Sequence, residues 1–495
     1  MLTFLLLIPI VTAAALFLGN GSRSWSKIAA LLQLVVTFLL WFSYDKTKAG
    51  YQFVFATEPL FPGLDLRYSV GVDGLSLLML LLTALVTVAA VWFSPKMAGD
   101  KRAGLFDGSV LLISAGATGA FLAKDLFFFY AFHELALIPT FLLIGFWGSG
   151  ERQAVAWKIT IYLGLGSIVL LTGLVDLFLA IPAATRTFDL QKLQEIAASH
   201  VIPAAAQLRP WLLLTTGFGI LVSLFPFHSW AAPAYACAPT PVAMLHSGVL
   251  KKFGLYGMLR LVVPFLPQAF HQPVFGTWTA QDLLLAALLG NIIYVGLVTI
   301  AQRKLDYMIG YSSVMHMGYV FLGIASMNFI GLNGACLLMF SHGLSVAALF
   351  AITGVLRERE GSLNFERLGG AAKSVPFLSI AFAMAAFASI GLPGFSNFAS
   401  EVLVFFGGFK EGATPFLKTT TILALWGVVM SAVYMLRAYK AVFLGEATAS
   451  SLKWSDLQGG ARYAFALLPI ALLVGGFFPH YVLGFLKPTL EAALR

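Results

Sequence analysis

The sequence predicts an all-α polytopic membrane protein with about fourteen transmembrane helices, and three observations carry this prediction. Of the 495 residues, 59% are hydrophobic and 11% are charged. Soluble domains are roughly 45–50% apolar and about 25% charged, so the composition excludes a soluble protein. The mean hydropathy of +0.88 agrees with a chain that lies mostly in lipid. The hydrophobic residues also fall into separate runs, and fourteen helices of roughly 20 residues would use most of them.

The runs are separated by short stretches of turn-forming and charged residues. The first run, residues 2–19, contains Ala13-Ala14-Ala15, which is similar to a signal-peptide cleavage site. A signal peptide needs a positively charged start, and no Lys or Arg precedes Arg23, so an uncleaved first helix is favoured. The predicted spans are 2–19, 28–44, 73–94, 109–123, 126–147, 155–181, 210–228, 241–263, 281–301, 306–326, 331–356, 375–410, 418–442 and 463–487.

Proline and glycine interrupt two of these spans. Span 7 is broken within residues 221–241, and span 12 within 390–397, where Pro393 removes a backbone donor. Irregular backbone persists in a bilayer only where protein or trapped water satisfies it. Two such breaks at corresponding positions are typical of a repeated transporter core with its site at the midplane. Two unrelated proline kinks are the alternative.

The breaks lie five spans apart, which predicts two five-helix repeats within a single membrane domain, residues 1–495. The predicted parts are the N-terminal helices 1–3 in residues 1–108, repeat one with helices 4–8 in 109–263, repeat two with helices 9–13 in 281–442, and helix 14 in 463–487.

The basic residues predict an orientation. The net charge is +9, but the Lys and Arg residues are scattered over many short loops, which favours membrane topology over nucleic-acid binding. With the N-terminus outside, the inner loops would hold roughly 16 Lys and Arg residues, against roughly 11 in the outer segments. We therefore expect both termini on the outer side.

Several ionisable residues lie within predicted spans: Glu134 in span 5, Lys158 near one end of span 6, Lys251 and Lys252 in span 8, and Glu401 after the break in span 12. A charged side chain at the centre of a spanning helix costs about 2.5–3.5 kcal/mol on insertion scales, so it requires a partner, water or a function. Carboxylates and lysines in water-filled half-channels can relay protons. A structural ion pair between Glu134 and Lys158 is the alternative, and Lys158 could also reach the membrane surface.

Histidines strengthen the relay interpretation, because an unperturbed pKa near 6.5 suits proton shuttling. His316 and His342 lie on the adjacent spans 10 and 11, and His228 follows the break in span 7. A lone buried histidine is more often a hydrogen-bonded core residue, so the alignment of the set carries the argument.

The sequence contains no dinucleotide-binding glycine motif, no P-loop, no His-Glu-x-x-His and no Gly-x-Ser-x-Gly. Cys237 and Cys336 have no Cys-x-x-Cys partner, which argues against a disulfide framework, a zinc site or an iron–sulfur cluster in this chain. Any nucleotide, flavin or cluster is therefore expected elsewhere.

Short motifs follow one another between about residues 68 and 445. They include Tyr68-Ser-Val-Gly-Val-Asp-Gly-Leu-Ser, Glu134-Leu-Ala-Leu-Ile-Pro, Trp157-Lys-Ile-Thr-Ile-Tyr, Phe225-Pro-Phe-His-Ser-Trp, Tyr311-Ser-Ser-Val-Met-His-Met, Ser341-His-Gly-Leu and Gly391-Leu-Pro-Gly-Phe-Ser-Asn. In order and spacing these motifs resemble those of the antiporter-like membrane subunits of respiratory complex I, most closely the subunit M type. The resemblance implies fourteen helices, inverted repeats in spans 4–8 and 9–13, and proton translocation driven by quinone reduction in other subunits. It also implies a multi-pass protein of the bacterial inner membrane, whose partners are other membrane-arm subunits and the lipid bilayer. NADH, FMN, iron–sulfur clusters and quinone would bind in those partners.

By resemblance, Glu134, Lys158, Lys252 and Glu401 match the family's ionisable residues in spans 5, 6, 8 and 12. The family's span-7 lysine is absent, since that position is Leu221, and Pro233 stands where the family has an acidic residue. One hypothesis is that Lys251 or Lys252 substitutes for the lost charge.

Other functions remain open. Subunits of multisubunit cation/proton antiporters and membrane-bound hydrogenases share the fold and the glutamate–lysine pattern. The missing lysine favours a non-pumping structural subunit. An autonomous secondary transporter would also use broken helices, but the sequence shows no distinctive substrate pocket.

Overall fold

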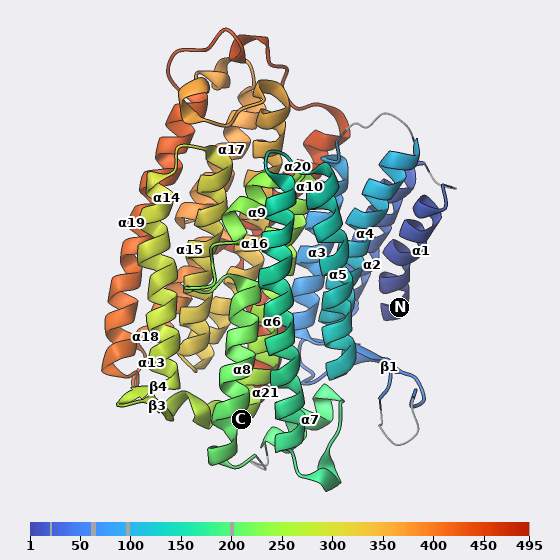
Figure 1. The fold of residues 1–495 in the computed structure, drawn as a ribbon, viewed down its shortest axis with the longest axis vertical. Coiled ribbons are helices and arrows are strands. Elements are labelled where there is room, and N and C mark those ends of the chain that lie inside the picture. The colour runs from blue at the N-terminus through green and yellow to red at the C-terminus, as the bar shows by residue number, and fades with distance from the viewer. Residues whose placement is uncertain (20–21, 61–65, 96–99, 199–201, 495) are drawn as a thin grey trace.

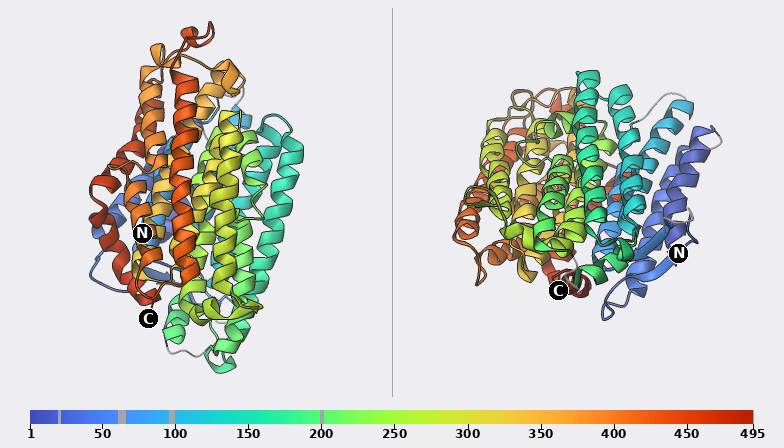
Figure 2. Two further views of the ribbon diagram at one scale, coloured as in Figure 1. Left: turned by 90° about the vertical axis from the view of Figure 1, so that its left-hand side faces the viewer. Right: turned by 60° about the horizontal axis from the view of Figure 1, so that its bottom comes forward.

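The computed structural model describes residues 1–19, 22–60, 66–95, 100–198 and 202–494. Its helices run along the long axis of an elongated bundle, which confirms the prediction of a mostly helical protein (Figure 1). α1 lies at one edge of the bundle and α19 at the opposite edge (Figures 1 and 2). Two antiparallel hairpins lie near the lower end, pairing β1 (Gln52–Ala56) with β2 (Ser69–Val72) and β3 (Pro273–Phe275) with β4 (Trp278–Thr279).

Within the described residues, ten helices or helix pairs are long and apolar enough to cross a membrane. They are α2 (Arg23–Ser43), α3 (Gly74–Trp92), α4 (Asp100–Leu122), α5 (Leu126–Trp147), α6 (Arg152–Ala180), α13 (Ala280–Leu289) with α14 (Val295–Ala301), α15 (Leu305–Ala325), α16 (Phe329–Glu360), α19 (Pro415–Phe443) and α20 (Gly459–Phe477). The other helices are α1 (Leu2–Phe17), α7 (Leu190–Ala198), α8 (Ala204–Val222), α9 (Ala231–Cys237), α10 (Thr240–Leu245), α11 (Lys252–Gly257), α12 (Val263–Phe265), α17 (Pro376–Ile390), α18 (Ser396–Phe409) and α21 (Pro479–Ala493).

The core of the bundle consists of helices that are apolar on every side. In the most apolar stretch of each helix, 100% of the residues are buried in α3 and α16 and 94% in α15. In α6 and α19 the buried share is 44%. A helix that is hydrophobic all round is stable only when it is surrounded by other elements. α3, α15 and α16 are therefore the internal helices, and the outer helices present apolar side chains to lipid or to partner chains.

The predicted break in span 7 is confirmed. α8 ends at Val222 and α9 begins at Ala231, and Ser223 between them has a left-handed backbone with φ of 67°. The buried Asn291 lies in a π-helical segment between α13 and α14. Its amide nitrogen donates to the carbonyls of Ser223 (3.1 Å) and Val314 (2.9 Å), and its oxygen accepts from the backbone N–H of Phe225 (2.6 Å). One side chain thus satisfies the irregular backbone that lipid could not.

Replacing Asn291 with leucine is expected to destabilise the protein strongly, because two carbonyls and one N–H would lose a partner inside the bundle. Each buried polar group left unsatisfied costs roughly 1–3 kcal/mol. Thermal unfolding of the detergent-solubilised protein should show a much lower midpoint. Asn364→Leu is the control, since the Asn364 side chain accepts a single 3.4 Å bond from Glu366 N–H. Equal midpoints for the two variants would contradict this interpretation.

The break in span 12 is also confirmed, and its cause is local. α17 ends at Ile390, Gly391 follows with φ of 80°, and α18 begins at Ser396. The Ser389 carbonyl would normally accept from the N–H four residues later, but that residue is Pro393, which has none. This carbonyl is instead 2.8 Å from Nε2 of His316 on α15. The proline therefore leaves a buried acceptor for a histidine of another helix.

Several predicted boundaries differ from the structure, and two of these differences have a clear physical cause. The predicted last span, 463–487, is divided, because α20 ends at Phe477 and α21 begins at Pro479, which cannot donate a helical hydrogen bond to α20. α21 instead packs against α3 and α16. α4 begins at Asp100 rather than at 109, because hydropathy marks the apolar part of a helix and not its polar end.

Candidate functional site

Lys252 lies at the centre of the buried polar residues. It follows the π-helical segment His246–Leu250 and its side chain is 0% exposed. Its Nζ donates to the Ser247 carbonyl at 2.7 Å and lies 2.9 Å from Nδ1 of His342 on α16. π-helical turns add a residue to the helix and are frequent at functional sites. Here the turn directs a lysine towards a histidine of the innermost helix.

Lys251 is equally buried but points to different neighbours. Its Nζ donates to the Ser313 hydroxyl of α15 at 3.4 Å and lies 5.6 Å from the ring centroid of Tyr235 on α9. Neither lysine forms an ion pair with a carboxylate of the described residues. The two adjacent lysines are therefore surrounded by neutral polar groups and an aromatic ring.

A line of polar groups continues from His342 to the break in span 12. The ring centroids of His342 and His316 are 5.5 Å apart. Nδ1 of His316 lies 2.8 Å from the Ser312 carbonyl, and Nε2 lies 2.8 Å from the Ser389 carbonyl. A neutral imidazole can donate to only one of these carbonyls, whereas a protonated imidazole donates to both. The number of hydrogen bonds that His316 donates therefore depends on its protonation state.

Glu401 is buried on α18, just beyond the break. Its side chain lies against Gly391, where an added β-carbon would overlap Oε2, and Oε1 has no hydrogen-bond partner in the described part of the chain. α18 packs against α15 and α16, the helices that carry His316 and His342. The Tyr434 hydroxyl is 2.8 Å from the Ser312 hydroxyl, which places it beside His316. The structure therefore brings Lys252, His342, His316 and Glu401 into one internal region.

Glu134 and Lys158 lie on the outer side of the bundle. The Glu134 side chain is 34% exposed and borders a cavity of about 190 Å³ between α5 and α6. Lys158 is exposed on α6. The structure forms no ion pair between them, so the alternative of a Glu134–Lys158 pair is wrong for this conformation. Oε1 of Glu134 lies 3.5 Å from Nδ1 of the buried His133.

His228 lies apart from the central line, beside the break in span 7. Its ring stacks on Phe225 at 5.4 Å and meets Tyr294 edge-on at 5.9 Å. The nearby Leu221 is buried, and a β-carbon added at Gly166 of α6 would lie 3.2 Å from its Cδ2. The position of the family's span-7 lysine is thus filled by apolar packing between α8 and α6.

Sequence reasoning missed two features near the site. One is His133, although it directly precedes Glu134. The other is the buried ion pair between Arg260 and Asp73, in which Nη1 and Nη2 of the guanidinium group both contact the carboxylate. Nη2 also donates to the Ser76 hydroxyl at 3.0 Å. Asp73 also caps α3 by accepting from Ser76 N–H, and Asp before an apolar run is the signal that could have indicated this role.

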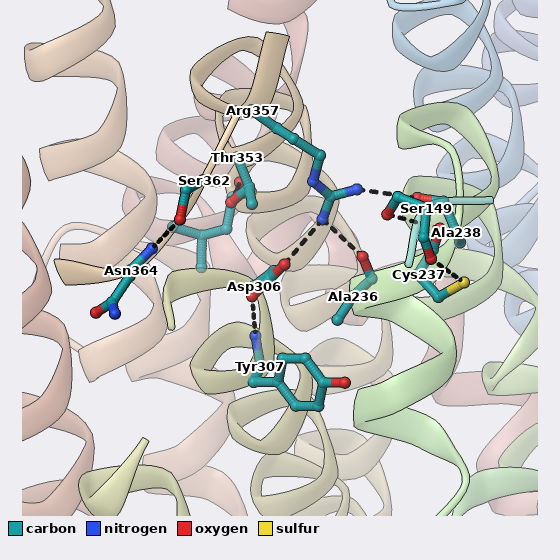
Figure 3. A network of polar contacts seen from close by, with 11 residues as sticks. Ser149, Ala236, Cys237, Ala238, Asp306, Tyr307, Thr353, Arg357, Ser362 and Asn364 are labelled. Carbon is teal, nitrogen blue, oxygen red and sulfur yellow. Dashed lines mark hydrogen bonds and ion pairs between the residues drawn. The ribbon is translucent and has the colours of Figure 1, made fainter. Parts of the chain in front are cut away.

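A separate polar network joins the ends of several helices (Figure 3). Arg357 at the end of α16 donates to the Ala236 carbonyl (2.7 Å) and the Ala238 carbonyl (3.3 Å) at the end of α9. It also pairs with Asp306 at the start of α15 (3.1 Å). An arginine satisfies the free carbonyls at a helix end and opposes its dipole. Arg357 therefore fixes α9, and with it Tyr235, relative to the internal helices.

The fold and this site define a polytopic membrane protein with an ionisable core, and comparison with known proteins identifies its family. Residues 123–427 match the family described as "NADH:quinone oxidoreductase/Mrp antiporter, TM". The chain is 34% identical to NAD(P)H-quinone oxidoreductase chain 4 2 of Thermosynechococcus vestitus, over 97% of this chain and 89% of that protein. It is 33% identical to NADH-quinone oxidoreductase subunit M of Rickettsia prowazekii, over 99% of this chain and 97% of that protein.

Solved structures agree with this assignment. A chain of respiratory complex I from Thermus thermophilus with bound NADH matches with a TM-score of 0.87 and 30% identity, over 100% of this chain and 98% of that chain. A chain of the Mrp complex from Dietzia sp. matches in fold, with a TM-score of 0.82 and 19% identity, over 100% and 99% of the two chains. The chain therefore belongs to the NADH:quinone oxidoreductase/Mrp antiporter family of membrane subunits, which confirms the resemblance found in its motifs.

Proposed function

We propose that this chain is a proton-translocating membrane-arm subunit of a complex I-type NADH:quinone oxidoreductase. The observation that carries the proposal is the internal line from Lys252 through His342 and His316 to the region of Glu401. The near full-length similarity to subunit M and chain 4 proteins supports the same assignment. Glu134 and Lys158 would lie at the outer end of the path and His228 beside it.

The geometry suggests how a proton moves along this line. A protonated Lys252 gives one proton from Nζ to Nδ1 of His342, 2.9 Å away, and becomes a neutral amine. His342 passes a proton towards His316, which holds it between two carbonyls, and Glu401 accepts it as a carboxylic acid. Each transfer breaks one N–H bond and forms one N–H or O–H bond, so the charge moves without a covalent intermediate. Lysine, histidine and glutamate suit this role because neighbouring charges and burial change their proton affinity.

The proposal includes a finer architecture. α8 with α9, α10 to α12, and α17 with α18 would form spans 7, 8 and 12 of fourteen, with α1 as the first span and two inverted repeats around the breaks. Both termini lie in the lower half of Figure 1, which supports an even number of passes. The division at residues 109–263 and 281–442 stays a prediction. The same holds for placement in the bacterial inner membrane with the termini outside.

Redox chemistry would belong to partner subunits. Within the described residues, no group of three or more His, Cys, Asp or Glu side chains could hold a metal ion. NADH, FMN, iron–sulfur clusters and quinone are expected in the other subunits of the assembly. This chain would serve the enzyme as part of its translocase.

A Lys252→Met variant tests the proposal. We expect the number of protons moved per NADH oxidised to fall by about one, because this chain contains one central relay. The measurement is proton uptake against NADH oxidation in inverted membrane vesicles that contain the whole complex. Lys453→Met is the control, since Lys453 is exposed.

An unchanged ratio for Lys252→Met would contradict proton translocation by this chain. It would favour the second candidate, a non-pumping structural subunit, for which Leu221 is the specific observation. Sodium-dependent proton exchange without NADH oxidation would point to a cation/proton antiporter subunit.

A further inference from the structure

The proposed relay still needs a connection from Glu134 to Lys251 and Lys252. Lys252 is the first residue of α11, and Lys251 directly precedes it. Leu221 stands at the position of the family's span-7 lysine. Its side chain is aliphatic and packs against α6, so this position has no group that could carry a proton. We propose that His133 and His246, which we call the histidine bridge, make this connection in its place. This inference rests on the proposed function and names two further proton-carrying residues of the same path.

The first half of the bridge is fixed next to Glu134. The His133 residue is 3% exposed, and its Nδ1 faces Oε1 of Glu134 at 3.5 Å. Both atoms are buried, and in the described part of the chain neither has another hydrogen-bond partner. The His133 ring stacks on Phe253 with centroids 3.9 Å apart and an interplanar angle of 16°. Because Phe253 directly follows Lys252, this stack holds His133 between the outer glutamate and the helix that carries the lysines.

The second half of the bridge lies on the π-helical segment. His246 is 3% exposed, and both of its ring nitrogens lack hydrogen-bond partners among the described residues. Its ring lies 5.6 Å from the ring centroids of Trp230 and of Tyr235. Lys251 Nζ lies 5.6 Å from the same Tyr235 ring. The His246 carbonyl accepts from Lys251 N–H at 3.0 Å, as the i to i+5 spacing of a π turn requires, so the two residues follow each other on one side of the helix.

The two histidines belong to elements in direct contact. α5, which carries His133, packs against the π-helical segment that carries His246. The bridge therefore runs from the outer surface of α5 to Lys251 without passing through α8.

A structural role does not explain these side chains. Buried histidines that serve packing are normally hydrogen-bonded, and an unsatisfied buried polar group costs roughly 1–3 kcal/mol. Among the described residues, Nδ1 of His133 has only the 3.5 Å approach of the Glu134 carboxyl oxygen, and both ring nitrogens of His246 have no hydrogen-bond partner. Such sites are where buried water binds. Imidazoles separated by water transfer protons, because each ring can accept at one nitrogen and release at the other.

The proton steps balance. A proton leaves the Glu134 carboxyl group for Nδ1 of His133, and the ring releases a proton from Nε2 to intervening water. His246 accepts one proton from that water and releases another, and the neutral amine of Lys251 accepts it. One O–H bond is broken and one N–H bond is formed overall, so one proton has moved inward.

The test uses the assembled complex in inverted membrane vesicles. His133→Phe keeps a ring for the stack on Phe253, and His246→Leu keeps an apolar volume between Trp230 and Tyr235. We expect each variant to lower the proton-to-electron ratio as far as Lys252→Met does. His480→Phe, which changes an exposed histidine, is the matched control. Assembly is checked by the NADH oxidation rate with a soluble electron acceptor.

A rescue separates proton transfer from folding. Adding Leu221→Lys to His133→Phe returns a titratable group to span 7, and we expect it to restore the ratio. If Lys252→Met lowers the ratio while both histidine variants keep it normal, the histidine bridge is overturned and the proposed function stands. If Lys252→Met also leaves the ratio normal, the proposed function fails and the bridge fails with it. A lowered ratio that Leu221→Lys does not restore would also overturn the bridge.

Discussion

Gly391→Ala is expected to stop proton translocation through this chain. Gly391 ends α17 with φ of 80°, a left-handed conformation that costs a residue with a β-carbon roughly 1–2 kcal/mol. The added β-carbon would also overlap Oε2 of Glu401. The carboxyl group must then leave its place beside Gly391, and the relay would lose its last acceptor. The ratio of protons moved to NADH oxidised in vesicles measures this loss.

Gly412→Ala is the matched control for this variant. Gly412 has φ of 87° but no heavy atom within 4 Å of an added β-carbon. It therefore carries similar backbone strain without displacing any side chain. We expect Gly412→Ala to pump normally. If both variants pumped normally, Glu401 would not need the position seen in the structure.

Asp73→Ala is expected to prevent stable folding of the subunit. Asp73 and Arg260 are 5% and 3% exposed, and removal of the carboxylate leaves the Arg260 guanidinium as an uncompensated buried charge. Breaking a buried ion pair in this way costs about 3–5 kcal/mol. The expected result is loss of the subunit from purified membranes, measured by immunoblot and by thermal unfolding of any protein that remains.

Two controls separate charge burial from the loss of a cap. Asp176→Ala removes the partner of Arg209, whose side chain is 80% exposed, so the loss should be under about 1 kcal/mol. The double variant Asp73→Leu with Arg260→Leu removes both charges and should recover much of the lost stability. A mild effect of Asp73→Ala alone would show that water reaches Arg260.

The helical membrane fold could be predicted because it depends on composition. The two helix breaks could be predicted because they depend on local chemistry. Pro393 and Gly391 interrupt a helix wherever it lies, so the break in span 12 is visible in the sequence. The groups that satisfy the breaks could not be predicted. Asn291 and His316 reach them from other helices, and their contacts depend on how the helices rotate against one another.

The candidate site shows the same division. Lys252 and Glu401 were identifiable because a charge within a span is costly. The predicted alternative of an ion pair between Glu134 and Lys158 failed because hydropathy does not show which side of α5 and α6 faces outward. His133 was overlooked because it lies within a run of aromatic residues and looks like one more packing side chain.

The hydrogen bond between His316 and the Ser389 carbonyl couples the charge of a side chain to the shape of the backbone. When Nε2 of His316 carries no proton, that carbonyl is buried without a donor, which costs roughly 1–3 kcal/mol. The unwound turn next to Glu401 therefore has a different energy in each protonation state of a residue on another helix. The turn between α17 and α18 is thus coupled in energy to the proton on His316, as well as being the place where the Glu401 side chain is held.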